Sequence, residues 1–216
     1  MSNETASSGL KIAVFGSGRG SNFGAIDKAI REGILPHATI VLVVSNNASA
    51  GILERAKKGQ IPVLHISAVQ FDSEEKYVGS LLEELQRHQV NFIALAGYMK
   101  RLPSGLITKY RNRIVNIHPA LLPKFGGKGM YGEHVHRAVL ESGDKQSGAT
   151  VHVVDEEYDT GPVVLQKEVP VLPSDTVETL AARVLEIEHL IYPAAIRLFA
   201  EGRISFREQG VVVHHQ

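Results

Sequence analysis

A glycine-rich turn between an apolar run and an amphipathic segment constrains this chain most. The apolar run spans residues 10–15 (LKIAVF), the turn spans residues 16–22 (GSGRGSN), and residues 23–31 carry apolar side chains at helical spacing. A strand, a tight turn and a helix in this order form the first half of a βαβ unit. The N-terminal part is therefore expected to build a parallel sheet.

Strand-like and helix-like segments continue to alternate along the first half of the chain. We expect strands at residues 39–44, 62–66, 91–96 and 113–117, and helices at residues 50–58 and 73–88. The strand segments are nearly continuous apolar runs, which are typical of strands covered on both faces. This pattern predicts an α/β fold with a Rossmann-like, doubly wound, mostly parallel central sheet.

The alternation gives way to a hairpin and one long helix in the second half. Residues 149–154 and 163–169 are predicted to form an antiparallel hairpin extension, and the acidic turn between them is long enough to indicate a function. A long C-terminal helix is expected over residues 176–201. Because no repeat or linker interrupts the chain, residues 1–216 are expected to form a single domain, with residues 1–9 flexible.

Charge and composition exclude several classes of protein. The 23 basic and 23 acidic residues cancel without a long basic block, so neither nucleic acid nor a membrane surface is an expected partner. The absence of cysteine excludes disulfides and thiol nucleophiles. No apolar run reaches the roughly 18–20 residues of a transmembrane helix, and the polar start MSNETASSG is unlike a signal peptide. We expect a soluble, cytoplasmic protein, either a monomer or a homodimer.

The glycine-rich turn is expected to bind an anion. Backbone N–H groups at a helix start suit a phosphate, and the favoured ligand is a small phosphate ester held by Gly20, Ser21 and Asn22. A dinucleotide fits less well, because Ser21 replaces the third glycine of that fingerprint and residues 45–47 (SNN) supply no acid for a ribose. A tight turn without a ligand remains the simpler alternative.

Polar side chains follow the predicted strand at residues 113–117. Strand alternation puts Asn116 and His118 on one face at its carboxyl end, where open α/β sheets bind ligands. The amide can donate to a carbonyl oxygen, and the imidazole can stabilise charge or move a proton. A histidine satisfied by local hydrogen bonds is the alternative. Asp159, in the acidic turn, is the expected third member, because a carboxylate would orient the ring and favour its charged form.

The sequence motifs argue against a metal site and against a covalent enzyme intermediate. His134 and His136 are two residues apart at a predicted helix start, so their rings point apart, and no acidic partner completes a zinc motif. The chain has neither a Gly-x-Ser-x-Gly turn nor a cysteine, which argues against a covalent acyl-enzyme. We therefore expect no metal and no NAD.

These motifs together resemble the phosphoribosylglycinamide formyltransferases, a branch of the folate-dependent formyltransferases. The resemblance covers residues 11–207. It rests on six motifs: GRGSN (18–22), AGYM (96–99), NIHPALLP (116–123), GATVH (148–152), DTGP (159–162) and EHxxYP (188–193).

The resemblance implies a reaction and a role for each motif. The family transfers the formyl group of 10-formyltetrahydrofolate to the amine of 5-phosphoribosylglycinamide in de novo purine biosynthesis. By this resemblance residues 10–118 form the phosphate-binding half and residues 119–216 the folate-site half with the C-terminal helix. The matching positions are Gly20, Ser21 and Asn22 for the substrate phosphate, Asn116, His118 and Asp159 for catalysis, Glu188 for the ribonucleotide, and Met99, Lys100, Arg101, Leu102, Asn116, Val154 and Asp159 for the folate.

Two segments depart from the family pattern. Many members place a basic residue after Phe-Asp-Ser to help hold the folate glutamate tail, whereas Glu74 follows Phe71-Asp72-Ser73 here. The segment of residues 126–132 (GGKGMYG) is longer than in some members. Its four glycines fit either a mobile loop over the site or an ordered surface excursion.

Other functions remain as alternatives. Formyltetrahydrofolate deformylase, a hydrolase, resembles this family through the same Asn, His and Asp, but it normally carries an N-terminal regulatory domain, and only about nine residues precede the first predicted strand here. Methionyl-tRNA formyltransferase adds a C-terminal nucleic-acid-binding domain that this neutral chain is not expected to have. A non-catalytic nucleotide-binding module is disfavoured by the intact catalytic trio.

Overall fold

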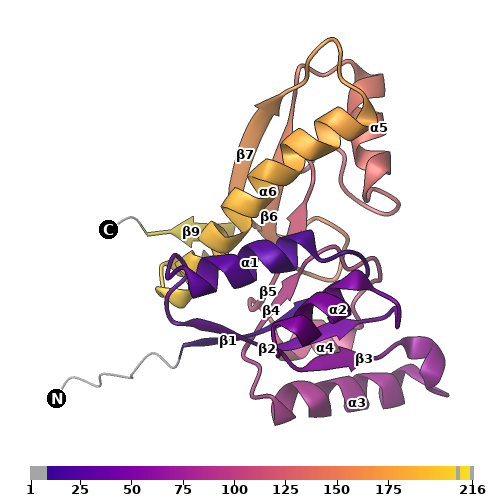
Figure 1. The fold of residues 1–216 in the computed structure, drawn as a ribbon, viewed down its shortest axis with the longest axis vertical. Helices are drawn as coiled ribbons and strands as arrows, with labels where there is room; N and C mark the ends of the chain where they lie inside the picture. The colour runs from indigo at the N-terminus through magenta and orange to yellow at the C-terminus, as the bar shows by residue number, and fades with distance from the viewer. Residues whose placement is uncertain (1–8, 208–209, 215–216) are drawn as a thin grey trace.

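The structure is a computed structural model that describes residues 9–207 and 210–214 (Figure 1). Of the segment expected to be flexible, residues 1–8 lie outside the described residues. In chain order the elements are β1 (Leu10–Phe15), α1 (Ser21–Arg31), β2 (Ala38–Ser45), α2 (Gly51–Lys58), β3 (Val63–His65), the 3₁₀ turn η1 (Ala68–Gln70), α3 (Glu74–Arg87), β4 (Phe92–Leu95), α4 (Ser104–Lys109), β5 (Ile114–His118), α5 (Glu133–Ser142), β6 (Gln146–Val153), β7 (Val163–Pro170), α6 (Val177–Ala200), β8 (Ile204–Arg207) and β9 (Gly210–Val213).

Seven strands form the central sheet in the order β3-β2-β1-β4-β5-β6-β7. The first five of these are parallel neighbours, whereas β6 runs antiparallel to both β5 and β7. The predicted doubly wound, mostly parallel sheet with an antiparallel extension and a long C-terminal helix is therefore confirmed. The strand order reverses between β1 and β4, and in open α/β sheets ligands bind outside the carboxyl ends of the strands at this point.

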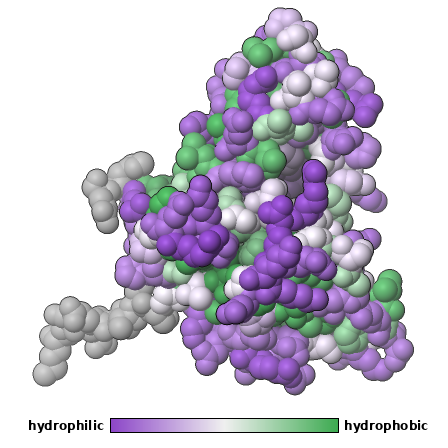
Figure 2. All heavy atoms as spheres, viewed as in Figure 1, coloured by the Kyte–Doolittle hydropathy of each residue, from purple (hydrophilic) through white to green (hydrophobic). Residues whose placement is uncertain are grey.

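Helices cover both faces of the sheet and bury a core on each (Figure 1). Helices α1, α2, α5 and α6 contribute to one core, with buried side chains such as Ile26, Ile52 and Tyr192. Helices α3 and α4 contribute to the other, with Leu81, Leu85 and Leu106. This explains why the strands are apolar on both sides. On the face drawn in Figure 2, hydrophilic residues cover most of the surface and hydrophobic ones form small scattered patches.

Helix α1 begins two residues earlier than the apolar periodicity predicts. Gly20 precedes it in the left-handed region (φ 76°), and Ser21 and Asn22 form its first turn. The prediction began at Phe23 because polar residues in a first turn add nothing to an apolar pattern. The helix N-terminus therefore lies directly at the glycine-rich turn.

The other long helices have the expected bounds to within one residue. The Ser73 hydroxyl accepts a hydrogen bond from the Lys76 N–H at the start of α3, and Thr176 caps α6 in the same way by accepting from Thr179 N–H. Both contacts satisfy N–H groups that the first helical turn leaves free.

Several short elements, α4, β8 and β9 among them, were not predicted from the sequence. Helix α4 has six residues, too few for a helical period to emerge. Strands β8 and β9 pair with each other in a separate two-stranded sheet after α6. Within the described ranges no helix is long and apolar enough to cross a membrane. The single-domain interpretation stays a prediction.

Candidate active site

A cleft of about 530 Å³ opens at the carboxyl ends of β4 and β5. Its walls come from residues 97–102, the loop of residues 127–132 and the acidic turn of residues 154–159. Asn22 and Glu188 close it on the side of α1. The cleft thus lies where strand topology places ligand sites in such sheets.

Asn116 and His118 reach the cleft from the last residues of β5. The antiparallel pairing with β6 sets Asn116 opposite His152 and His118 opposite Thr150. The amide Nδ2 of Asn116 lies 3.1 Å from Nε2 of His152. The site therefore holds one amide and two imidazoles across a single strand pair.

The His118 ring is buried and held at both nitrogens. Its Nε2 lies 2.8 Å from the carbonyl oxygen of Phe125, and its Nδ1 lies 3.6 Å from Oδ2 of Asp159. A carbonyl oxygen can only accept, so Nε2 carries the proton in this arrangement.

Burial lowers the pKa of His118 below its ordinary value, although Asp159 and the Phe125 carbonyl act in the opposite direction. The carboxylate stabilises a charged ring as expected, but the cost of burying that charge is larger.

Asp159 lies between the two imidazoles. Its Oδ1 is 3.4 Å from Nε2 of His152, and its Oδ2 accepts a hydrogen bond of 2.9 Å from the backbone N–H of Gly127. Burial alone would raise the pKa of Asp159, but the neighbouring imidazoles of His152 and His118 and the Gly127 N–H together lower it. The carboxylate is thus ionised at neutral pH and faces two groups that can carry protons.

The backbone is strained at two residues that contact His118. Phe125 and Asp159 have φ values of 58° and 57°, in the left-handed region that residues with a side chain rarely adopt. Such conformations persist only where the surrounding structure fixes them, and they cluster at functional sites. Here they direct one carbonyl and one carboxylate at the same ring.

The proposed phosphate-binding residues divide into two groups. Gly20 and Ser21 lie at the start of α1 and are not among the residues that line the cleft. The side chain of Asn22 turns away from them and donates from Nδ2 to Oε2 of Glu188 at 2.5 Å. Its Oδ1 is buried and has no hydrogen-bond partner among the described residues.

Glu188 lies on α6 with its carboxyl group almost fully buried. This burial raises the pKa of Glu188 to about 7, and the hydrogen bond from Asn22 opposes the shift. The carboxyl group can therefore gain or lose a proton near neutral pH. Together with the unpartnered Asn22 Oδ1, it offers hydrogen-bonding sites to a ligand that carries hydroxyl groups.

The positions that resemble a folate pocket all line the cleft. They are Met99, Lys100, Arg101, Leu102, Asn116, Val154 and Asp159. The Arg101 guanidinium donates from Nη2 to the backbone carbonyl of Glu156 at 2.7 Å, which joins the two walls. Glu74 begins α3 and is not among the lining residues.

The loop of residues 127–132 covers one side of the cleft. Its first residue, Gly127, holds Asp159, and the preceding Phe125 holds His118. The loop is therefore part of the site rather than a distant surface excursion.

His152 was not predicted as a site residue, although its motif contributed to the family resemblance. The signal that identifies it is the pairing of β5 with β6, because two antiparallel strands bring their alternating residues together in pairs. His136 is buried on α5 and His134 is exposed. Among the described residues, no three His, Asp or Glu side chains are grouped so as to hold a metal ion.

The fold and the cleft define an α/β protein with a ligand site at the carboxyl ends of its parallel strands, and comparison with known proteins assigns the family. The formyl transferase family model matches residues 10–196, so the chain belongs to the formyl transferase family. Within that family its relatives include phosphoribosylglycinamide formyltransferases, as the resemblance predicted.

Two of these relatives illustrate the extent of the match. The Escherichia coli phosphoribosylglycinamide formyltransferase is 41% identical over 199 residues, which are 92% of this chain and 91% of that protein. The chloroplastic enzyme of Vigna unguiculata is 44% identical over 201 residues, or 93% of this chain. The chain spans 64% of that plant protein's length. Because one relative is chloroplastic, the cytoplasmic location stays a prediction.

Solved structures agree in fold. Glycinamide ribonucleotide transformylase 1 from Symbiobacterium toebii superposes with a TM-score of 0.89 at 42% identity, covering 96% of this chain and 95% of that one. A formyltetrahydrofolate deformylase from Pseudomonas syringae superposes with a TM-score of 0.84 at 25% identity, covering 97% of this chain and 67% of that one. The fold is therefore shared by a transferase and a hydrolase.

Proposed function

We propose that this enzyme transfers the formyl group of 10-formyltetrahydrofolate to the amine of 5-phosphoribosylglycinamide, in de novo purine biosynthesis. The observation that supports this most is the convergence of Asn116, His118 and Asp159 on one cleft. In the proposed reaction the amine nitrogen attacks the formyl carbon, and the bond from that carbon to the folate N10 breaks. One proton leaves the amine nitrogen and one reaches N10.

Asn116 is proposed to stabilise the formyl oxygen. As the amine adds, that oxygen gains negative charge, and an amide N–H fixed in a water-poor cleft stabilises the charge. One N–H of the Asn116 amide faces His152, which leaves the other for the substrate. The amide therefore needs no reorganisation as the charge develops.

His118 and Asp159 are proposed to act as one proton-handling unit. Because burial lowers the pKa of His118, the ring is neutral before the reaction and can take the proton from the amine nitrogen. Asp159 then lies against the charged ring and stabilises it until the proton passes to N10. A pair poised in this way returns to its starting state after each turnover.

The two ends of the ribonucleotide are proposed to bind on α1 and α6. Backbone N–H groups of Gly20 and Ser21 lie at the positive end of the α1 dipole, which favours the phosphate. Asn22 is proposed to complete the phosphate site, and the Glu188 carboxyl group is proposed to accept from the ribose hydroxyls. The amine then extends toward Asn116, while Met99–Leu102, Val154 and Asp159 hold the folate.

Hydrolysis of 10-formyltetrahydrofolate is the second candidate, because the deformylase fold superposes closely on this chain. The test uses purified protein with 10-formyltetrahydrofolate, in the presence and in the absence of 5-phosphoribosylglycinamide, and follows tetrahydrofolate and formate. The proposal expects tetrahydrofolate release that depends on the amine acceptor, without formate. Formate released at the same rate without acceptor would show a hydrolase instead.

A further inference from the structure

The hydroxyl group of Tyr192 lies between two neighbouring strands beneath the cleft. It is 2.8 Å from the carbonyl oxygen of Leu95 on β4 and 3.1 Å from that of Val115 on β5. The side chain is fully buried on α6, and burial raises the pKa of Tyr192 well above its usual range. The hydroxyl therefore keeps its proton and shares it between the two carbonyl groups.

Both carbonyl groups belong to the peptides that lead into the cleft. The Val115 carbonyl carbon is bonded to the backbone nitrogen of Asn116, and Leu95 pairs with Asn116 in the sheet. Because a peptide unit is planar, the orientation of the Val115 carbonyl also sets the orientation of the Asn116 backbone, from which the side-chain amide extends. The Leu95 carbonyl ends β4, two residues before the wall of residues 97–102 begins.

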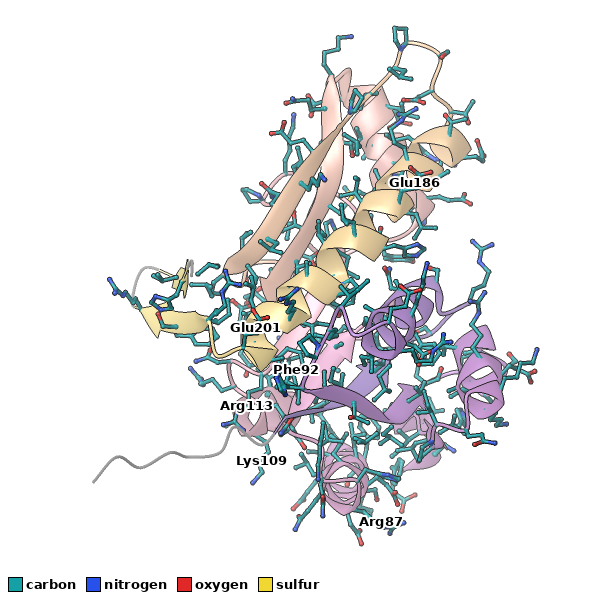
Figure 3. All side chains as sticks on the ribbon, turned by 60° about the vertical axis from the view of Figure 1, so that its left-hand side comes forward. Arg87, Phe92, Lys109, Arg113, Glu186 and Glu201 are labelled. Atoms are coloured by element: carbon teal, nitrogen blue, oxygen red, sulfur yellow. The ribbon has the colours of Figure 1, made fainter. Side chains whose placement is uncertain are left out.

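Helix α6 is a firm support for this hydroxyl. One turn before Tyr192, Glu188 holds Asn22 through a 2.5 Å hydrogen bond. Near its C-terminal end, the ring of Phe199 packs on Phe92 of β4 with centroids 5.0 Å apart. Figure 3 shows the same relation: Phe92 lies beside the end of α6 at Glu201, while Glu186 lies far along the helix. The helix is thus fixed to α1 on one side of Tyr192 and to the sheet on the other.

We propose that Tyr192 is a positioning residue for the transfer reaction, which holds the ends of β4 and β5 at the spacing that aims the Asn116 amide at the formyl oxygen. The inference rests on the proposed function. It assigns Tyr192 no contact with substrate, so its loss should slow the chemical step and leave substrate binding nearly unchanged. A small misplacement of a catalytic group is enough to cost about 100-fold in rate.

The chain offers a matched control for a Tyr192→Phe variant. Tyr110 is also buried, and its hydroxyl also donates to a backbone carbonyl, that of Val90, at 3.2 Å. Val90 precedes β4, at the end of that strand opposite the cleft. Tyr110→Phe therefore removes the same kind of hydrogen bond from the segment just before β4, away from the reacting groups.

The experiment measures kcat, the KM for each substrate and the melting temperature for both variants. We expect Tyr192→Phe to lower kcat by about 10- to 100-fold with each KM within about twofold. Tyr110→Phe should keep kcat within about twofold of wild type at a similar loss of melting temperature. Equal effects of the two variants on kcat, or a loss confined to KM, would overturn the proposal.

Two further measurements keep the proposal testable. The first serves if Tyr192→Phe folds poorly, and the second serves if the reaction differs from the one proposed. Replacement of Tyr192 by p-aminophenylalanine restores an N–H donor at the same place and should recover most of the lost kcat. The side-chain amide NMR signals of Asn116 should shift in Tyr192→Phe and not in Tyr110→Phe, whatever the substrate. Unshifted Asn116 signals would refute the positioning role, whereas wild-type protein without acceptor-dependent transfer would refute the function alone.

Discussion

The side-chain amide of Asn116 lies against the ring of His152, with Nδ2 and Nε2 3.1 Å apart. The other ring nitrogen, Nδ1, is 3.0 Å from the carbonyl oxygen of Val153, which can only accept a hydrogen bond. In the neutral ring the proton therefore sits on Nδ1, and Nε2 accepts from Asn116. This contact fixes which way the amide points, so that its second N–H remains for a ligand in the cleft.

Asn116→Ala should lower kcat by roughly 100- to 1,000-fold, because it removes the donor to the developing oxyanion. Asn116→Asp should do no better, since it places a negative charge against that oxygen. Asn91→Ala is the control, because Asn91 bonds the backbone of Lys11 and Gly9 at the opposite end of the sheet. Steady-state kinetics with both substrates measures the effect. Activity of either Asn116 variant within a few-fold of wild type would remove Asn116 from the mechanism.

A side chain at Gly20 should weaken phosphate binding. A Cβ atom there would lie 2.8 Å from the Cβ of Ile52, and the positive φ of 76° disfavours any side chain. Gly20→Ala should therefore displace the N–H groups at the start of α1. Hydrogen bonds to a charged group contribute about 1.5–3 kcal/mol, so the KM for 5-phosphoribosylglycinamide should rise about 10- to 100-fold.

Gly18→Ala is the control for the glycine turn. A Cβ atom at Gly18 meets no atom within 4 Å, and φ is not positive. This variant should bind both substrates as the wild type does, and Gly20→Ala should keep its folate affinity. Equal loss of affinity for both substrates in Gly20→Ala would show that the glycine turn does not bind the phosphate.

Much of the site could be predicted because its residues follow strands or turns that the sequence marks clearly. Asn116 and His118 end an apolar run, and the acidic turn that holds Asp159 is unusually long for a hairpin. The carboxyl ends of parallel strands meet at one edge of a sheet, so local patterns were enough to place Asn116 and His118 at the site. Spacing alone could not show that Asp159 contacts His118, because its turn follows the antiparallel strand β6. The sheet itself followed from the alternation of apolar runs with amphipathic helices.

Contacts that depend on three-dimensional pairing could not be predicted. His152 joins the site only because β6 pairs antiparallel with β5 in one register. The Asn22 side chain bonds Glu188, which lies 166 residues away in the chain. The protonation of His118 depends on burial, which outweighs the nearby carboxylate and leaves no trace in residue spacing.

The buried carboxyl group of Glu188 should leave a signature in the pH dependence of stability. Its pKa is raised from 4.5 to about 7 in the folded protein, so between these values the folded state holds a proton that the unfolded state has lost. Stability from this group is complete below about pH 4.5 and is lost as the pH rises through about 7. The total amounts to roughly 3 kcal/mol.

Glu188→Gln removes this dependence, and denaturant unfolding from pH 4.5 to 8 measures it. The variant should gain free energy of unfolding relative to wild type as the pH rises. Glu186→Gln is the control, because Glu186 lies exposed on the same helix (Figure 3). A constant difference between Glu188→Gln and wild type across this range would contradict the account.

The pairing of His118 with Asp159 supports the whole mechanism, because their side chains approach to 3.6 Å and no other carboxylate of the described residues comes within ion-pair distance of that ring. Each single alanine variant should lower kcat by about 100- to 10,000-fold, as expected for loss of a proton-transfer group. Asp155→Ala is the control: its carboxylate lies in the same acidic turn but bonds Glu157 and Thr160.

The most direct test is a double-mutant cycle on kcat with His118→Ala, Asp159→Ala and their combination, in protein shown to bind both substrates. If the two side chains act as one unit, the double variant is about as slow as the slower single variant. If the two losses multiply in full, the residues act independently, and the mechanism proposed for this cleft is wrong.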